Sequence, residues 1–145
     1  SSENDQYGKE AIDTLMKRME DDRGKFGVIA AGYKDKMDDF MMMNPGLASR
    51  FTHKLHIDDY NEDELLAIFK SMAHKDQYTL SQTAEYKALD TIYKMVLSKD
   101  DSWGNAREMR NLLDATIQKL SIRVSQMPPD QVTKETYQLI LPEDI

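Results

Sequence analysis

The sequence predicts an α/β segment with two parallel strands and flanking helices, followed by an all-α helical bundle, so that the chain is mostly helical overall. Two observations lead to this fold class. A short apolar run at 26–33 and a second strand candidate at 53–57 alternate with helical patterns, an order typical of α/β architecture. Beyond residue 60, apolar residues recur at helical spacing, largely every three or four residues, which indicates helices. We therefore expect a boundary near Tyr60, with an α/β part at 1–60 and a helical part at 61–145.

The α/β part is predicted to contain helices at 9–22 and 34–43. The run 26–33 is continuously apolar, as in a strand that is covered on both faces of a parallel sheet. Asn44-Pro45-Gly46 breaks the second helix, a helical turn follows at 47–51, and 53–57 is the second strand. Two strands are too few for a stable sheet. We expect that another chain, or an earlier part of a longer domain, completes it.

Three longer helices are predicted beyond residue 60. Asn61 and Glu64 form a capping box at the start of the first. Ser81 caps the second, and Asn105 begins the third, which ends before Pro128-Pro129. A short element follows at 133–141. The buried side of the second helix is expected to consist of Tyr86, Leu89, Ile92, Tyr93 and Val96.

Composition excludes several classes of protein. The 145 residues include no cysteine, which excludes disulfide scaffolds, thiolate metal sites and cysteine nucleophiles. A formal net charge of -7 argues against a nucleic-acid partner. No apolar run approaches the roughly 20 residues of a membrane span, and no signal peptide is visible. The positions of the three histidines in the sequence would not bring their side chains to a shared metal ion, so no metal site is predicted. We expect a cytoplasmic protein without a membrane partner.

The chain lacks the phosphate-binding loop that ends in Gly-Lys-Ser/Thr. Its two Gly-Lys pairs are Gly8-Lys9 and Gly24-Lys25. Neither has a glycine five residues before the pair, and neither lysine is followed by Ser or Thr. No acidic pair that could hold magnesium follows a buried strand. The chain alone is therefore expected to be inactive as an ATPase.

Two arginines lie at positions where a bound anion would account for their positive charge. Arg107 lies in the predicted first turn of a helix, where a positive charge is normally unfavourable and a phosphate is favoured. The alternative is that Glu108 neutralises both Arg107 and Arg110 at the surface. Arg50 follows the rigid Asn44-Pro45-Gly46 loop and could stabilise a transferring phosphoryl group. The alternative here is an ordinary exposed loop arginine.

Three stretches in this order, 28–33, 44–51 and Gly104-Asn105-Ala106-Arg107, resemble the second half of an AAA+ ATPase module. The likeness is to the branch that contains stage V sporulation protein K, red-type Rubisco activase and type VII secretion ATPases. It extends from about Gly8 to the end of the chain. The resemblance implies that 1–60 is the C-terminal part of the α/β core and that 61–145 is the helical lid.

The resemblance also implies roles for three residues. Arg50 would be the arginine finger, which reaches the ATP of the next subunit in a ring that is usually hexameric. Arg107 would be the second sensor, which contacts the γ-phosphate in its own subunit. Tyr33 falls near the first-sensor position, where the family commonly has a polar residue such as Asn. The parent protein would use ATP and Mg²⁺ to remodel a protein substrate, and the missing P-loop predicts that this chain is a fragment. The rival hypothesis is a non-enzymatic helical module that binds a protein partner.

Overall fold

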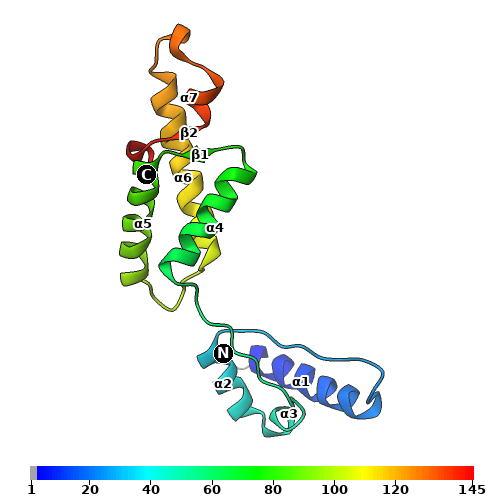
Figure 1. Ribbon diagram of the computed structural model, residues 1–145. Coiled ribbons are helices and arrows are strands. Elements are labelled where there is room, and N and C mark those ends of the chain that lie inside the picture. The colour runs from blue at the N-terminus through cyan, green and yellow to red at the C-terminus, as the bar shows by residue number, and fades with distance from the viewer. Residues whose placement is uncertain (1–2) are drawn as a thin grey trace. The chain divides into compact units, whose positions relative to one another are not determined.

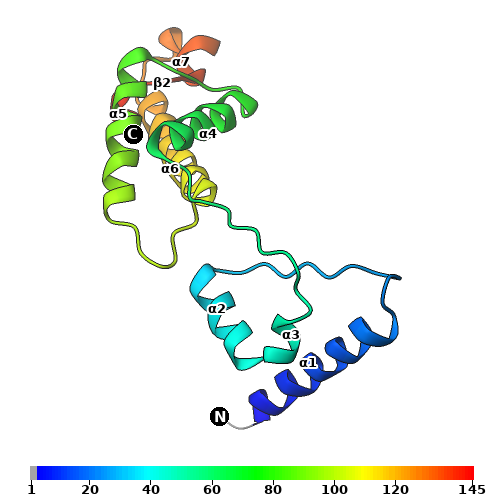
Figure 2. The ribbon, with the colours of Figure 1, turned by 60° about the horizontal axis from the view of Figure 1, so that its bottom comes forward.

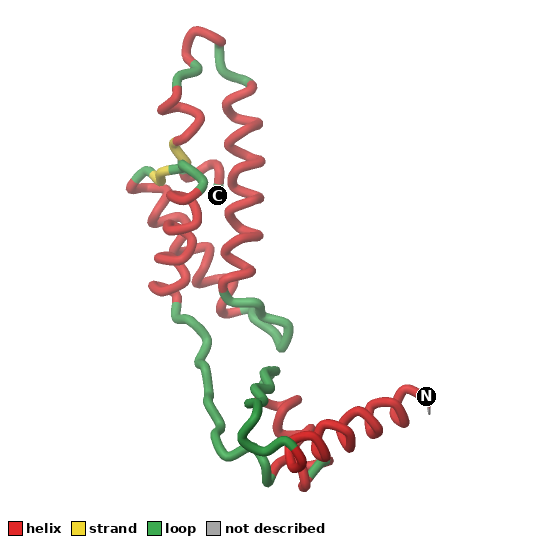
Figure 3. Tube along the Cα trace, turned by 90° about the vertical axis from the view of Figure 1, so that its right-hand side faces the viewer, coloured by secondary structure: helices red, strands yellow, loops and turns green. Residues whose placement is uncertain are grey.

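The computed structural model describes residues 3–145, with side chains described from Tyr7 onward. The chain forms two compact units, which divide between Ile57 and Asp58. Both are built mainly from helices, coloured red in Figure 3, and only one short pair of strands is present in the described residues. The mostly helical character that the sequence predicts is therefore confirmed. Each unit is described by itself below.

The first unit contains three helices: α1 (Glu3–Asp21), α2 (Lys34–Met43) and α3 (Pro45–Ala48). The short helix α3 contacts both α1 and α2, as Figure 2 shows. Pro45 occupies its first position, where the missing N–H of proline costs nothing. Leu47 of α3 is fully buried, and it is the only fully buried hydrophobic residue of this unit whose side chain is described. The core of the first unit is accordingly small.

The two strands predicted at 26–33 and 53–57 are wrong for this structure, because both segments lack regular secondary structure. Their apolar side chains are largely open to solvent: Ile29 is 97% exposed, Leu55 92% and Ile57 89%. A strand is stabilised by hydrogen bonds to a neighbouring strand, and no ladder forms for either segment within the described residues. Both segments are thus extended chain that joins no sheet within the described residues.

The second unit is a helical bundle, drawn from green to red in Figure 1. Helix α4 packs against both α5 and α6, and the C-terminal turn η2 contacts α5 and α6. The bundle's elements are α4 (Glu62–Lys75), β1 (Thr79–Leu80), α5 (Gln82–Leu97), α6 (Ala106–Ser125), η1 (Pro129–Gln131), α7 (Lys134–Gln138), β2 (Leu139–Ile140) and η2 (Pro142–Asp144). Its core consists of Leu65, Phe69, Ala73, Ala84, Ala88, Ile92, Met109, Leu113, Leu120 and Ile140.

The predicted caps of α4 and α5 are confirmed. The side chain of Asn61 accepts a hydrogen bond from the backbone N–H of Glu64 at 2.9 Å, and the carboxylate of Glu64 accepts one from the N–H of Asn61 at 2.9 Å. Ser81 accepts from the N–H of Ala84 at 3.2 Å. Caps of this kind contribute about 1 kcal/mol each, because they satisfy donors that have no partner inside the helix.

The buried side of α5 agrees with the predicted one at Ile92 and differs from it at the two tyrosines. Tyr86 is 67% exposed and Tyr93 is 52% exposed, while Ala84, Ala88 and Ile92 are buried. These three residues are spaced by four and lie on one face of the helix. Small alanines allow α5 to approach the rest of the bundle closely, so the helix turns its alanine face inward and its tyrosines outward.

The two parallel strands found among the described residues lie in the second unit, where the sequence predicts a helical bundle. β1 pairs with β2 in a parallel register, with Thr79 opposite Leu139 and Leu80 opposite Ile140. The pair fixes the C-terminal segment, since the N–H of Ser81 also donates to the carbonyl of Ile140 at 3.0 Å. Ile140 is fully buried in the bundle core.

Candidate functional site

The loop before α6 has a backbone conformation that is rare for a residue other than glycine. Asn105 has φ 49° and ψ -113° and immediately precedes the helix. Asn105 is the N-cap residue of α6, as the sequence predicts, but its side chain makes no capping hydrogen bond to the helix. The side chain instead binds Asp59, Tyr60 and Trp103. Sequence reasoning placed Asn105 at the helix start correctly but missed these contacts.

Arg107 lies in the first turn of α6 and is exposed. Its backbone N–H donates to the carbonyl of Gly104 at 2.9 Å. The guanidinium makes no ion pair or side-chain hydrogen bond within the part of the chain that the structure describes. A Cβ atom at Gly104 would lie 3.0 Å from the Cβ of Arg107, so a glycine there lets the loop pass closely beside this side chain. A free guanidinium beside a helix N-terminus is well suited to bind a phosphate.

Glu108 does not neutralise the neighbouring arginines. Arg110 donates to the carboxylate of Asp76 at 2.6 Å and lies 4.0 Å from Asp114. Glu108 accepts a hydrogen bond from the side-chain amide of Asn111 at 3.3 Å. Of the two arginines, Arg110 therefore has a local structural role, whereas Arg107 is available to a ligand.

A turn at 100–102 shapes the loop that leads to Gly104. The carboxylate of Asp100 accepts hydrogen bonds from the hydroxyl of Ser102 at 2.6 Å and from its N–H at 2.8 Å. These bonds stabilise the charged form and hold the pKa of Asp100 below its ordinary value of 3.8. The N–H of Trp103 donates to the carbonyl of Asp100 at 3.0 Å, which connects the turn to the only tryptophan of the chain.

We expect acid to loosen this turn. Because the pKa of Asp100 is lower in the folded state than in the unfolded state, its contribution to stability is complete above about pH 4 and is lost as the pH falls through the folded value. Fluorescence of Trp103 during an acid titration measures the change. Asp100→Asn should remove that acid response, while the neighbouring Asp101→Asn should leave it intact. An unchanged titration in Asp100→Asn would contradict the assignment.

Arg50 lies in the first unit, just after α3. Its guanidinium donates to the carbonyl of Gly46 at 2.7 Å and to the carboxylate of Glu20 at 3.0 Å, and its Nε has no partner in the structure. The side chain is 33% exposed, and that of Glu20 is 64% exposed. Arg50 is therefore held by a loop carbonyl and one surface carboxylate, and the exposed ion pair with this carboxylate can be exchanged for one with another anion at small cost.

Tyr33 precedes α2 with an extended backbone, and its side chain makes no cap hydrogen bond. It is 59% exposed. Tyr33 and Arg50 belong to the first unit and Arg107 to the second, so the structure describes these residues separately.

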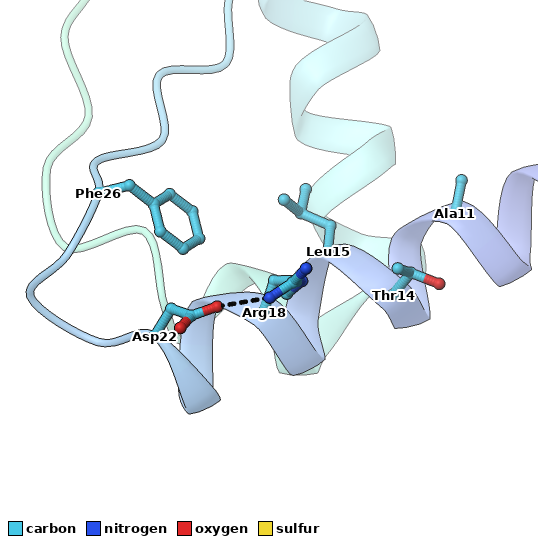
Figure 4. Close-up of a pocket in the computed structure, with 6 residues that line it drawn as sticks. All are labelled: Ala11, Thr14, Leu15, Arg18, Asp22 and Phe26. Atoms are coloured by element: carbon cyan, nitrogen blue, oxygen red, sulfur yellow. Dashed lines mark hydrogen bonds and ion pairs between the residues drawn. The ribbon is translucent and has the colours of Figure 1, made fainter.

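Two open hollows lie in the first unit. One, of about 570 Å³, is lined by Ala11, Thr14, Leu15, Arg18, Asp22 and Phe26, and Figure 4 shows the Arg18–Asp22 ion pair beside the ring of Phe26. It contains none of the predicted site residues. The other, of about 280 Å³, is more polar, and Arg23, Arg50 and His53 are among its lining residues. The second hollow thus includes the candidate finger.

Comparison with known proteins identifies the second unit. Residues 61–145, which are more than half of the chain, match the family described as the AAA lid domain. The chain belongs to the AAA+ ATPases. It is 39% identical over 142 residues to stage V sporulation protein K of Bacillus subtilis, covering 96% of this chain and 43% of that protein.

Two further AAA+ relatives show similar coverage. Chloroplastic ribulose bisphosphate carboxylase/oxygenase activase of Cyanidioschyzon merolae is 40% identical over 139 residues, 96% of this chain and 47% of the relative. A CfxQ homologue of Guillardia theta is 38% identical over the same fractions of the two chains. The chain therefore spans a little less than half the length of these relatives. No described helix is both long and apolar enough to cross a membrane.

Proposed function

We propose that this chain is the C-terminal part of an AAA+ ATPase module, with residues 1–60 from the α/β core and 61–145 forming the lid. The match to the AAA lid domain and the order of the motifs support this division. The exposed apolar side chains at 26–33 and 53–57 are consistent with strands that pair with a P-loop half of the same module.

Arg107 is proposed as the second sensor, which contacts the γ-phosphate of ATP in its own subunit. The observation that carries this proposal is the free, exposed guanidinium in the first turn of α6, beside a glycine that permits close approach. ATP would supply the phosphoryl group that is cleaved. Arg107 would contribute charge-assisted hydrogen bonds, which are about twice as strong as neutral ones.

Arg50 is proposed as the arginine finger, which acts on the ATP of the neighbouring subunit. Tyr33 would stand near the first sensor, where its hydroxyl can donate or accept one hydrogen bond. The parent protein would bind ATP with Mg²⁺, assemble as a ring of six subunits, and remodel a protein substrate. The described residues contain no group of three His, Asp or Glu side chains that could together hold a metal ion.

Replacing Arg107 tests the sensor assignment. In the ATPase that contains this chain, Arg107→Ala should weaken ATP binding by about tenfold to hundredfold and ADP binding much less, because a hydrogen bond to a charged group is worth about 1.5–3 kcal/mol. Arg110→Ala, which removes a charge one turn further along α6, should leave the ratio of ATP to ADP affinity unchanged.

Isothermal titration with both nucleotides measures these affinities. The proposed role of Arg107 would be contradicted if Arg107→Ala and Arg110→Ala changed the affinities for ATP and ADP equally. It would also be contradicted if Arg107→Ala bound both nucleotides with wild-type affinity.

A further inference from the structure

The side chain of Asn105 joins two segments that are far apart in the sequence. Its Oδ1 accepts hydrogen bonds from the backbone N–H of Tyr60 and from the indole N–H of Trp103, both at 3.2 Å. Its Nδ2 donates to Oδ1 of Asp59 at 2.7 Å. Both the acceptor and the donor of the amide are therefore used, and two of the three bonds reach the segment that precedes α4.

Asp59 completes this group of contacts. Its second oxygen, Oδ2, accepts a hydrogen bond from Nζ of Lys99 at 3.1 Å. Lys99 lies in the loop after α5, so the residues before α4 are bound from the α5–α6 loop at two places. We call Asp59, Tyr60, Lys99, Trp103 and Asn105 together the latch.

The backbone conformation at position 105 does not account for an asparagine there, whereas the contacts of its side chain do. A conformation with φ 49° and ψ -113° favours glycine, which would adopt it without strain. Glycine has no side chain, and so could not contact Asp59, Tyr60 or Trp103. The backbone strain at Asn105 is thus offset by a side chain whose hydrogen bonds connect the two sides of the latch.

The same residue also begins the turn that carries Arg107. The carbonyl of Asn105 accepts a hydrogen bond from the N–H of Glu108 at 3.0 Å, and the carbonyl of Gly104 accepts one from the N–H of Arg107 at 2.9 Å. A shift of Asn105 would therefore displace the first turn of α6 and the backbone of Asp59–Tyr60 together.

We propose that Asn105 is a positioning residue that couples the segment before α4 to the turn bearing Arg107. Through the latch, Asp59 and Tyr60 move with the start of α6. The use of this coupling in sensing a nucleotide rests on the proposed function of Arg107. The coupling itself can be tested without any nucleotide.

The test uses the 145-residue chain and two NMR readouts. Trp103 is the only tryptophan, so its indole N–H resonance reports on the α6 side of the latch without ambiguity. Amide exchange of Tyr60 reports on the other side. Asn105→Gly keeps a backbone that fits this conformation and should accelerate exchange at Tyr60 about fivefold or more, since one hydrogen bond is lost. Asp59→Ala, 44 residues before Trp103 in sequence, should shift the indole resonance.

A paired exchange separates coupling from a general structural role. Asn105→Asp places two carboxylates together and should disturb both readouts. Combining it with Asp59→Asn restores a donor opposite an acceptor and should return Tyr60 exchange to within about twofold of the wild type. Asp101→Asn, a charge change in the same loop, is the matched control and should move neither readout.

The proposal is overturned if Asn105→Gly leaves Tyr60 exchange unchanged, if Asp59→Ala leaves the Trp103 resonance in place, or if the paired exchange fails to restore Tyr60. Failure of the Arg107 assignment would instead appear in nucleotide affinity, with the latch readouts intact. The two outcomes are therefore distinguishable.

Discussion

Arg50→Ala should lower ATP turnover of the parent ATPase by about 10³–10⁵-fold while leaving ATP binding near the wild-type level. An arginine finger stabilises charge that develops only as the phosphoryl group is transferred, and effects of this size are typical of its loss. Arg50→Lys should recover little of the activity, because an ammonium lacks the planar fork that contacts two phosphate oxygens.

The contacts of Arg50 within its own unit supply the controls. Its exposed ion pair with Glu20 is worth about 0.2–1 kcal/mol, too little for its loss to imitate a defect in catalysis. Glu20→Gln, which removes that ion pair and keeps the arginine, should turn over ATP at near the wild-type rate. Arg23→Ala, which removes an exposed arginine from the same hollow, should do the same. Substantial turnover in Arg50→Ala would exclude the finger assignment.

Arg123→Ala should lower the free energy of unfolding of the second unit by about 3–5 kcal/mol, because it leaves a buried carboxylate without its partner. Asp144 is 1% exposed and accepts two hydrogen bonds from Arg123, both at 2.9 Å. It also accepts one from the N–H of Leu141, and Arg123 donates to the carbonyl of Leu139. The pair thus fixes η2 and β2 against α6. It also raises the pKa of Arg123 above its ordinary value.

Urea denaturation followed by circular dichroism measures this loss. Lys119→Ala removes another cation of α6, whose Nζ donates to the exposed carbonyl of Ile145, and should cost less than about 1 kcal/mol. A loss of similar size in both variants would show that the Arg123–Asp144 pair contributes no more to the free energy of unfolding of the second unit than an exposed lysine does.

The helices of the second unit could be predicted from the sequence because their signals are local. Asn61 with Glu64, and Ser81 ahead of α5, are caps whose partners lie three residues away. Pro128 and Pro129 end α6 by removing backbone donors. The exposed faces of Tyr86 and Tyr93 could not be predicted, because periodicity alone does not tell which of two apolar faces meets the bundle.

Features that depend on distant partners were not predictable from the sequence. The segments 26–33 and 53–57 are strand candidates, but a strand forms only beside another strand, and neither segment is paired within the described residues. Arg107 could be singled out because its charge is unusual at a helix start. The role of Asn105 could not, since its contact with Asp59 spans 46 residues. Asp144 has an acidic neighbour, and nothing in the sequence around it indicates that its partner is Arg123.

The most direct test of the account is a mixing experiment in the parent ATPase. If Arg50 acts on the neighbouring site and Arg107 on its own, Arg50→Ala and Arg107→Ala subunits, each impaired alone, complement one another in a ring. Random mixing of equal amounts should restore about a quarter of wild-type turnover, since one site in four then has both arginines.

A double variant that carries both substitutions is the control. Mixed with Arg50→Ala subunits, it should restore nothing, because no subunit then supplies a finger. Recovery of turnover in the first mixture alone is the result that the account predicts. No recovery in either mixture would contradict the assignment of Arg50 to the neighbouring site and of Arg107 to its own.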